Sequence, residues 1–345
     1  MFWDRLDSFN IMENLGMLST MPLLAPILTV LLLVAYGLFR RFSRGKGQLG
    51  SRTDHALTSP AEYGFERRAL GIGAIAVIVL YFVEFVVRGY VFNFYNTVDW
   101  WRYATPLIAA GLTLGVLLLH IVRQRTAAAP AHPVVATARR TWLSFGPRVG
   151  IIGIGALVAA FVATTLAAGA ASSPDDRGRY IYIALDAANT TLDPLRFWFY
   201  GWAYGIPVII CVGALAVMTW WALSANALRP FRMPEAPGLE QGARTQIAAG
   251  ITSLTSAAML LALGGAFKLI NNARGPWGLT IEGENRSEPY EVTWHYANLA
   301  AAAGFISPLL EVTGFMLLIF AARRLLRTQP SQQPSEKTVT DEVVR

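Results

Sequence analysis

The chain has little charge, a single cysteine and only four histidines among its 345 residues. Charged residues make up 15% of it, whereas soluble domains of this size carry about 25%. Cys211 alone allows no disulfide within the chain and no cysteine-based metal site. The histidines are His55, His120, His132 and His295, and no two of them share one membrane depth at which they would ligate a haem. These absences argue against an ordinary soluble enzyme, and we expect no metal or other cofactor.

Motifs of the common enzyme classes are also missing. The sequence contains no P-loop, no H-E-x-x-H helix and no G-x-S-x-G turn. The last apolar segment holds no lysine, which excludes a retinal Schiff base of the seven-helix kind there. An enzyme acting on lipid or sugar at the membrane surface would need paired acids, and only Asp175-Asp176 and Glu282 with Glu284 offer them. We therefore favour a function without catalysis and keep an enzyme as the third hypothesis.

What the chain does contain is long apolar segments. Each of the seven reaches about the 20 residues that are needed to cross a bilayer. They run over about residues 22–39, 69–92, 104–122, 149–171, 199–223, 246–270 and 299–322. This pattern predicts an all-α polytopic membrane protein whose seven-helix membrane domain occupies residues 1–322. The polar residues 323–345 are rich in Ser, Gln and Pro and predict a disordered cytoplasmic tail.

Lysine and arginine alternate in density from one loop to the next. The stretches 40–68, 123–148, 224–245 and 323–345 hold 20 of the 29 basic residues. Because positive loops stay in the cytoplasm, we predict an inner (plasma) membrane protein with its N-terminus outside and its C-terminus inside. The net charge of +7 is then an orientation signal with some affinity for anionic lipid heads, and no nucleic acid partner is expected. The strong preference for arginine over lysine is typical of a GC-rich bacterium.

A short aromatic phrase recurs where three of the segments begin. With the first segment as an anchor, the other six form three hairpins. The second helix of each hairpin begins with W-x-Y followed by alanine or glycine. The phrase indicates either three tandem repeats or an aromatic belt at the membrane surface. If the three units converge, they form an outer vestibule able to stack an apolar or sugar-like ligand. Its residues would be Trp101, Tyr103, Trp202, Tyr204, Trp294, His295 and Tyr296.

Two further patterns concern the outer loops and helix packing. Alternation on both sides of a polar turn within 278–294 predicts a β-hairpin, and residues 180–183 offer another strand, so we expect a small cap on the outer face. Small residues spaced by four let helix backbones approach closely in lipid, and they predict central positions for the fourth and sixth segments. These residues are Gly155, Ala159, Ala163 and Ala167 in the fourth segment and Ala258, Ala262 and Ala266 in the sixth.

Glu311 is the candidate functional residue that the sequence singles out. It lies near the middle of the last apolar segment, where an unpaired charge costs at least about 2.5–3.5 kcal/mol. Pro308 removes a backbone donor and frees the carbonyl of Gly304. A kink, a free carbonyl and a carboxylate so close together are typical of broken-helix sites in transporters. The alternative is a protonated glutamate that acts as glue between helices. Hydroxyl partners at a similar depth are Thr113, Thr164, Thr255 and Ser256.

A second polar feature is the pair Glu84 and Arg88 in segment 69–92. The two residues are four apart, so they share one helix face, with the acid before the base. The pair indicates either simple neutralisation that lets the helix insert, or a gate or counter-ion that works with Glu311. Lys268 lies within one turn of the outer end of its segment, where we expect its side chain to reach water.

These observations favour a transporter, or a transport-associated subunit, with an acidic site in the middle of the membrane. The alternative is a non-transporting accessory or scaffold subunit that docks another membrane protein, or a second copy of itself, through the outer cap or the small-residue helix faces. The expected partners are therefore the lipid bilayer and another membrane protein.

Overall fold

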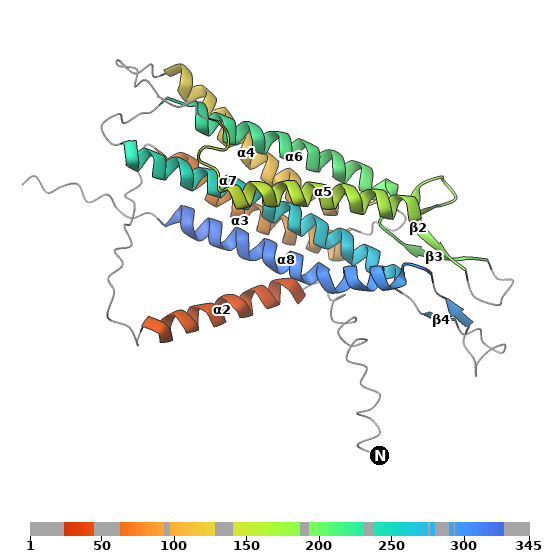
Figure 1. The fold of residues 1–345 in the computed structure, drawn as a ribbon. Helices are drawn as coiled ribbons and strands as arrows, with labels where there is room; N and C mark the ends of the chain where they lie inside the picture. The colour runs from red at the N-terminus through yellow and green to blue at the C-terminus, as the bar shows by residue number, and fades with distance from the viewer. Residues whose placement is uncertain are drawn as a thin grey trace, which may run out of the picture.

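The computed structural model describes residues 24–44, 63–92, 97–127, 141–186, 193–230, 237–274, 277–279, 290–292 and 294–327. Its long helices are α2 (Leu24–Arg44), α3 (Gly64–Val86), α4 (Trp101–Ala127), α5 (Arg148–Ala171), α6 (Trp202–Leu228), α7 (Pro237–Ile270) and α8 (Ala297–Leu326). Two short helical turns, η2 (Val87–Val91) and η3 (Asn271–Ala273), extend α3 and α7. Most of the long helices run roughly parallel in one elongated bundle (Figure 1).

Six helices of this described part are long and apolar enough to cross a membrane. They cover Gly64–Val91, Trp101–Gln124, Arg148–Ala171, Trp202–Leu228, Pro237–Ala273 and Ala297–Leu326. The chain is therefore a helical multi-pass membrane protein, as its sequence predicts. α2 carries a shorter apolar stretch, Leu24–Phe39, so a seventh span and the orientation of the termini stay predictions.

α7 forms the centre of the bundle. It packs against α3, α4, α5, α6 and α8, and 78% of its most apolar window is buried. Ala258, Ala262 and Ala266 are almost fully buried on it, and their small side chains let the neighbouring backbones come close. The prediction of a central position is confirmed for this helix.

α5 lies at the periphery, where it packs against α6 and α7. Only 17% of its most apolar window is buried. Its packed side carries larger residues such as Phe161 and Thr165, while the four residues spaced by four are all exposed: Gly155, Ala159, Ala163 and Ala167. The predicted central position is therefore wrong for α5, because the spacing of small residues does not tell which face of a helix a bundle will use.

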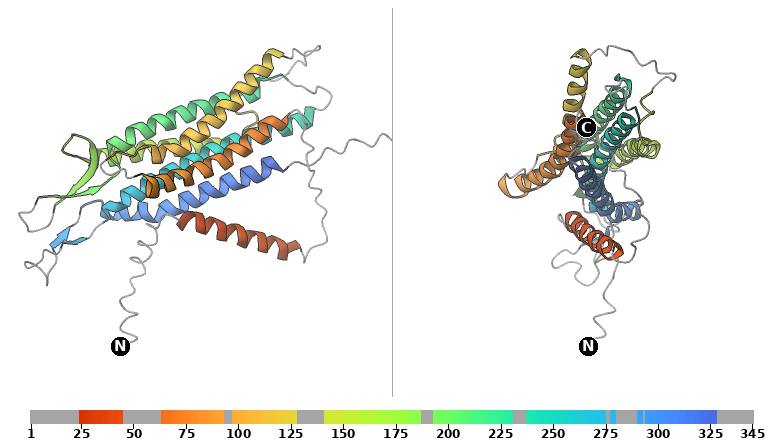
Figure 2. Two further views of the ribbon diagram at one scale, coloured as in Figure 1. Left: turned by 180° about the vertical axis from the view of Figure 1, so that it is seen from behind. Right: turned by 90° about the vertical axis from the view of Figure 1, so that its left-hand side faces the viewer.

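Short strands gather at one end of the bundle (Figures 1 and 2). They are β1 (Ser173–Pro174), β2 (Tyr180–Leu185), β3 (Leu195–Trp198), β4 (Trp277–Leu279) and β5 (Tyr290–Val292). β2 lies between β1 and β3 in an antiparallel sheet, and β4 pairs with β5. β2 buries alternate side chains, as expected for a sheet covered on one face. Residues 280–289 lie outside the described residues, so the predicted hairpin and its outer location stay predictions.

The two ends of the bundle differ in which helices begin there. α4, α6 and α8 begin at the end with the strands, which we call the strand end, and α3 and α7 begin at the opposite end (Figure 1). The helices also run further than the apolar segments predict: α7 begins at Pro237 rather than 246, and α6 continues to Leu228 rather than 223. These extensions carry charged side chains into the helical bundle at the opposite end.

Candidate functional site

Glu311 lies in the middle of α8 and is buried, with 3% of its side chain exposed. α7 passes close beside it. A Cβ on Gly264 would lie 2.7 Å from the Glu311 Cγ and 3.1 Å from the carbonyl oxygen of Ser307. The missing side chain at Gly264 therefore makes room for the carboxylate side chain. The Ser307 hydroxyl also donates to the Gly264 carbonyl over 2.8 Å, which fixes the two helices together at this level.

The partner of the Glu311 carboxylate is Tyr81 of α3. Its hydroxyl donates to Oε1 over 3.3 Å, a long hydrogen bond. The sequence offered threonines and a serine at the same depth instead. Thr255 shares a 2.8 Å hydrogen bond with Thr219 of α6, and Thr113 packs against Gly73 of α3. Thr164 lines a groove on another face. Depth along the helices thus suggests several hydrogen-bond partners for Glu311, but the actual partner depends on how α3 packs on α8.

Pro308 is accommodated inside α8 without ending it, since the helix is continuous from Ala297 to Leu326. Figure 1 shows α8 bending in the half where this proline lies. Next to it, the backbone of Gly304 is covered by the Asn271 side chain from η3, so close that no side chain would fit at Gly304. A polar amide therefore lies against the stretch of α8 that the proline loosens.

Charged residues from three further elements lie near Glu311. The predicted pair is present: the Arg88 Nε donates to the Glu84 Oε1 over 3.1 Å. Arg88 also lies 3.8 Å from the Asp99 carboxylate, which is 3.8 Å from Arg102. The sequence did not predict this extension. Arg88 belongs to the π-helical turn η2, and such turns are frequent at functional sites because they re-aim side chains.

Most of these side chains line a small, partly open cavity of about 70 Å³. We call the set the Glu311 cluster. It comprises Tyr81, Glu84, Arg88, Asp99, Arg102, Tyr103, Lys268 and Glu311. Lys268, which the sequence suggested would reach bulk water, lines this cavity together with Glu311. Since a water molecule takes about 30 Å³ in the liquid, the space suits a few waters or one small ion.

Tyr103 contributes a hydroxyl without a hydrogen-bond partner among the described residues. Its ring is 2% exposed and packs edge-on against Tyr200 and Tyr204, with centroid distances of 5.5 and 5.9 Å. The guanidinium of Arg102 lies 4.8 Å from the ring centre. Burial raises the pKa of the neighbouring Tyr200 above its ordinary value. Tyr103 lines the cavity, and leaving its buried hydroxyl unpaired costs about 1–3 kcal/mol.

The three aromatic units do not meet in one ring. Tyr103 and Tyr204 contact each other between α4 and α6, and the Trp202 ring packs against Gly169 of α5. Trp294 packs on Phe199 instead and donates its indole N–H to the Ala273 carbonyl. The remaining members differ in exposure: Trp101 is half-buried, while His295 and Tyr296 are exposed. The structure thus joins two units through the contact between Tyr103, which lines the Glu311 cavity, and Tyr204, and it places the third unit beside η3.

A larger apolar groove of about 680 Å³ lies between α5 and α8, with α7 beneath it. Trp294 and Tyr296 of the third aromatic unit line it, together with Phe199 and Phe267. Small residues of α5, such as Ala167, complete its wall. The groove carries almost no polar surface, which suits lipid chains or an apolar helix rather than a polar solute.

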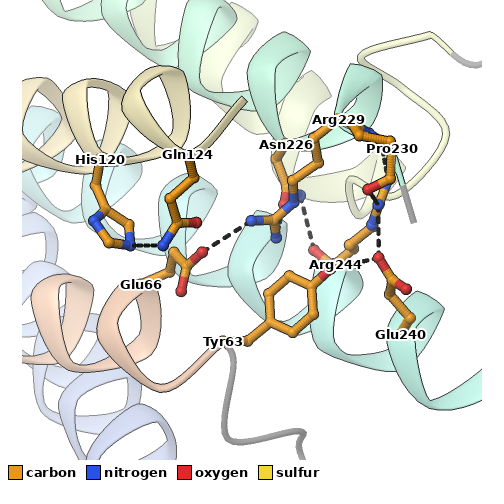
Figure 3. A network of polar contacts seen from close by, with 9 residues as sticks. All are labelled: Tyr63, Glu66, His120, Gln124, Asn226, Arg229, Pro230, Glu240 and Arg244. Atoms are coloured by element: carbon orange, nitrogen blue, oxygen red, sulfur yellow. Dashed lines mark hydrogen bonds and ion pairs between the residues drawn. The ribbon is translucent and has the colours of Figure 1, made fainter. Parts of the chain in front are cut away.

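A second buried polar cluster, which the sequence did not predict, lies at the opposite end of the bundle (Figure 3). We call it the Arg244 network. It comprises Tyr63, Glu66, Asn226, Arg229, Glu240 and Arg244, all at most 3% exposed. It joins the start of α3, the end of α6 and the first turns of α7.

The Arg244 guanidinium holds the centre of this network. It donates to Glu240 Oε1 and to the Pro230 carbonyl, each over 2.7 Å, and to the Arg229 carbonyl over 2.9 Å. The Tyr63 hydroxyl donates to the same Glu240 oxygen over 2.5 Å. Arg229 in turn donates to Glu66 over 2.9 Å. Every charged group here has a charged partner of opposite sign, as buried ions require.

Burial is the main cause of the pKa shifts of Tyr63 and Arg229, which lie just outside the apolar spans. It raises the pKa of Tyr63, against the opposing effect of Arg229, and it lowers the pKa of Arg229. Tyr63 is therefore a neutral donor at physiological pH. A sequence signal for the network did exist, because Glu240 and Arg244 are four apart. The density of basic residues predicts instead that both lie in a cytoplasmic loop, residues 224–245.

Asp175 and Asp176, two of the acids considered for an enzyme, form ion pairs at the strand end. Asp175 forms a 2.7 Å ion pair with Arg179, and Asp176 lies 3.1 Å from Arg196. Partial desolvation opposes ionisation of Asp175, but hydrogen bonds from the Arg179 side chain and from backbone N–H groups outweigh it and lower the pKa of this carboxyl. Such a depressed acid is a poor proton donor at neutral pH. Glu282 and Glu284 lie outside the described residues.

No protein-family model, curated protein or solved structure matches this chain. The function must therefore be argued from the geometry of the two buried clusters.

Proposed function

We propose that this protein is a transporter, or a subunit of one, whose mid-membrane site is the Glu311 cluster. In this proposal the chain spans a bacterial inner membrane seven times, with its N-terminus outside and its C-terminus in the cytoplasm. The strand end then faces outward as a small cap. Glu311 accepts and releases a proton during the transport cycle, and Pro308 provides the flexible point of α8 next to it.

The observation that carries the proposal is a cavity between four helices that five charged side chains line, with a sixth, Asp99, 3.8 Å from two of them. Charged residues inside a membrane are costly, and they persist where they serve an ion, proton or substrate pathway. Three acids, Glu84, Asp99 and Glu311, lie close to three bases in the described residues. A glutamate serving only as glue would need one hydrogen-bond donor, not a cavity lined with charges.

The polar side chains of the cluster extend from Glu311 towards the strand end. From Glu311 towards the strand end, the cluster continues through Arg88 and Asp99, which is only 15% exposed but lies outside α4. Towards the opposite end, apolar side chains such as Leu254, Phe315 and Leu318 are buried. A proton therefore has a polar route to Glu311 from the strand end in this conformation, and closing that route while opening another would complete alternating access.

Charge movement on protonation of Glu311 tests the proposal. Proteoliposomes on a solid-supported membrane should give a transient current after a step to lower pH, and Glu311→Gln should abolish it. Thr313→Val is the matched control, because Thr313 lies on the same helix with an exposed side chain. A wild-type current no larger than that of empty liposomes, or an unchanged current in Glu311→Gln, would reject the role of this carboxylate.

The second candidate function, an accessory subunit, is favoured by the exposed small-residue face of α5. Gly155 has nothing within 4 Å of the position of a Cβ, and Ala159 and Ala163 are exposed beside it. Such a face is suited to close contact with one more transmembrane helix. Native mass spectrometry from mild detergent distinguishes the two functions: a stable complex that Ala159→Phe disrupts supports an accessory subunit, and a monomer in both variants counts against it.

A further inference from the structure

The charged side chains of the Glu311 cluster divide into a chain of ion pairs and two further groups. Four of the six form a continuous chain in which neighbours are 3.1 to 3.8 Å apart. These four are Glu84, Arg88, Asp99 and Arg102. The other two, Glu311 and Lys268, come from the adjacent helices α8 and α7 and line the same cavity. The acid and the base outside the chain are therefore placed at one site.

The backbone of α7 explains why Lys268 turns inward rather than towards bulk water. Leu261, Gly265 and Lys268 all line the cavity, and their spacing of four and three residues puts them on one helix face. Gly264, on the same side, lies so close to Glu311 that a Cβ there would be 2.7 Å from the Glu311 Cγ. Helical side chains lean towards the N-terminus of their helix. The Lys268 side chain therefore extends over the turn where the two glycines leave space, beside Glu311.

Lys268 and Glu311 also have the strongest electrostatic influence on each other. Among the charged groups around Glu311, Lys268 has the largest effect, ahead of Arg102. Among those around Lys268, Glu311 has the largest effect, ahead of Arg102 and Arg88. Opposite charges attract each other more strongly inside a protein than in water, so an ammonium at Lys268 stabilises a carboxylate at Glu311.

Lys268 is also the one base of the cluster that can exchange a proton with Glu311. Arg88 and Arg102 stay protonated, because a guanidinium does not lose its proton in proteins. The other elements that pack against α7 or α8 bring no further charged group to the cavity lining among the described residues. Within their apolar parts, these elements carry Tyr36 of α2, Arg148 at the start of α5, and Tyr204 and Cys211 of α6.

A proton can occupy the pair in two ways. As an ion pair, Lys268 is an ammonium and Glu311 a carboxylate. Transfer of the proton breaks an N–H bond on Lys268 and forms an O–H bond on Glu311, which leaves an amine and a carboxylic acid with the same total charge. The Tyr81 hydroxyl donates a hydrogen bond to the Glu311 Oε1, and such a bond favours the carboxylate. The ion pair is therefore the form that this structure supports.

We propose that Lys268 is the positioning residue of the Glu311 proton site: its ammonium holds Glu311 as a carboxylate until acidification delivers a proton. Uptake of that proton forms one O–H bond on Glu311 and leaves the Lys268 ammonium as it is. Lys268 thereby sets the pH at which Glu311 is loaded. The inference rests on the proposed function for its role in transport, whereas the pairing of the two side chains is testable without transport.

Infrared spectroscopy of the full chain in nanodiscs, titrated with acid and base, tests the proposal. The C=O stretching band of a protonated carboxyl that is missing in Glu311→Gln reports the protonation of Glu311. Lys268→Met should move the midpoint of this band to higher pH by about 1–3 units, the usual effect of an opposite charge nearby. Lys268→Arg keeps the positive charge and should leave the midpoint close to that of the wild type.

Arg323→Gln is the matched control, because Arg323 is an exposed cation at the opposite end of α8. It should leave the midpoint unchanged. An unchanged midpoint in a folded Lys268→Met protein would overturn the proposal, and so would an equal shift in Lys268→Arg. A band that persists to higher pH in the wild type than in Lys268→Met would also overturn it, because the proton would then rest on Glu311 in a neutral pair.

The proposed transport function and the role of Lys268 fail separately. A pH-step current together with an unchanged midpoint in Lys268→Met retains the transport role of Glu311 and rejects that of Lys268. A shifted midpoint in a protein that gives no current retains the pair and rejects transport.

Discussion

The two buried polar clusters lie at different levels of the same bundle and differ in how tightly they are closed. In the Arg244 network, the ion pairs are 2.7 and 2.9 Å long, and Tyr63 adds a 2.5 Å hydrogen bond. In the Glu311 cluster, the ion pairs are 3.1 to 3.8 Å long, and the hydrogen bond from Tyr81 is 3.3 Å. The first cluster is filled by its own side chains, whereas the second surrounds a cavity.

This difference is the basis on which we distinguish a cluster that holds the helices together from one that serves a function. A closed network of short ion pairs fixes how helices meet, even though the Glu66 Oε2 and the Arg229 Nε have no hydrogen-bond partner among the described residues. A network with longer ion pairs beside a cavity leaves room for a water molecule or another small occupant. We therefore interpret the Arg244 network as the fastening of α3, α6 and α7, and the Glu311 cluster as the site at which something binds.

The largest expected effect comes from breaking the Arg244 network. Arg244→Met removes four hydrogen bonds, to Glu240 and to three backbone carbonyls, and leaves the Glu240 charge buried. Removing one partner of a buried ion pair costs about 3–5 kcal/mol of unfolding free energy. SDS titration of the purified protein measures this loss.

A double variant checks that the cost comes from the stranded charge. Arg244→Met with Glu240→Gln should be less destabilised than Arg244→Met alone, since no unpaired ion is left behind. Arg323→Met, at an exposed position, should change stability by less than about 0.5 kcal/mol. Equal losses in the buried and exposed variants would show that the network does not fasten the helices.

The next largest effect concerns the crossing of α7 and α8. Gly264→Ala places a Cβ 2.7 Å from the Glu311 side chain and 3.1 Å from a backbone carbonyl, and such overpacking costs about 1–3 kcal/mol. We expect it to reduce the pH-step current more than stability, because it moves the carboxylate. Gly155→Ala is the control, since nothing lies within 4 Å of that Cβ position. A current that survives Gly264→Ala unchanged would contradict the required position of Glu311.

The sequence predicted the fold class because apolar length is a local property. Runs of about 20 apolar residues need no knowledge of their neighbours to be recognised. The same reasoning missed the true starts of α3 and α7, since Glu66 and Glu240 are charged and read as loop residues. Their burial depends on Arg229 and Arg244, and the Tyr63–Glu240 contact joins residues far apart in the chain.

The candidate site was only partly predictable for a related reason. Glu311 stands out in the sequence as a lone acid within a span, and Glu84 with Arg88 stands out by spacing. Tyr81, Asp99 and Arg102 reach the site through the packing of α3, α4 and α8, which no local pattern reveals. Lys268 lies near a helix end, where snorkelling is the usual outcome, and only the cavity shows that it faces inward.

A smaller effect, of opposite sign, is expected at Tyr103. Tyr103→Phe keeps the ring contacts with Tyr200 and Tyr204 and removes a buried hydroxyl that has no hydrogen-bond partner among the described residues. The variant should be as stable as the wild type or more stable, by up to about 1 kcal/mol. SDS titration of the purified variants measures the difference. A clear loss of stability would mean that the hydroxyl is structural.

The smallest expected effect lies at a half-buried ion pair at the strand end, between Asp175 and Arg179. Asp175 accepts hydrogen bonds from the backbone N–H groups of Arg177 and Arg179 as well as the Arg179 side chain. Because these bonds lower its pKa in the folded state, their stabilisation is present above the unfolded-state pKa and is lost as the pH falls through the folded-state value.

Hydrogen exchange of the turn between β1 and β2 should show this loss. Protection of the turn, corrected for intrinsic exchange rates, should fall in the wild type below about pH 4 and should be low at every pH in Asp175→Asn. Turn protection that is independent of pH in the wild type would show that Asp175 is not the group that holds it.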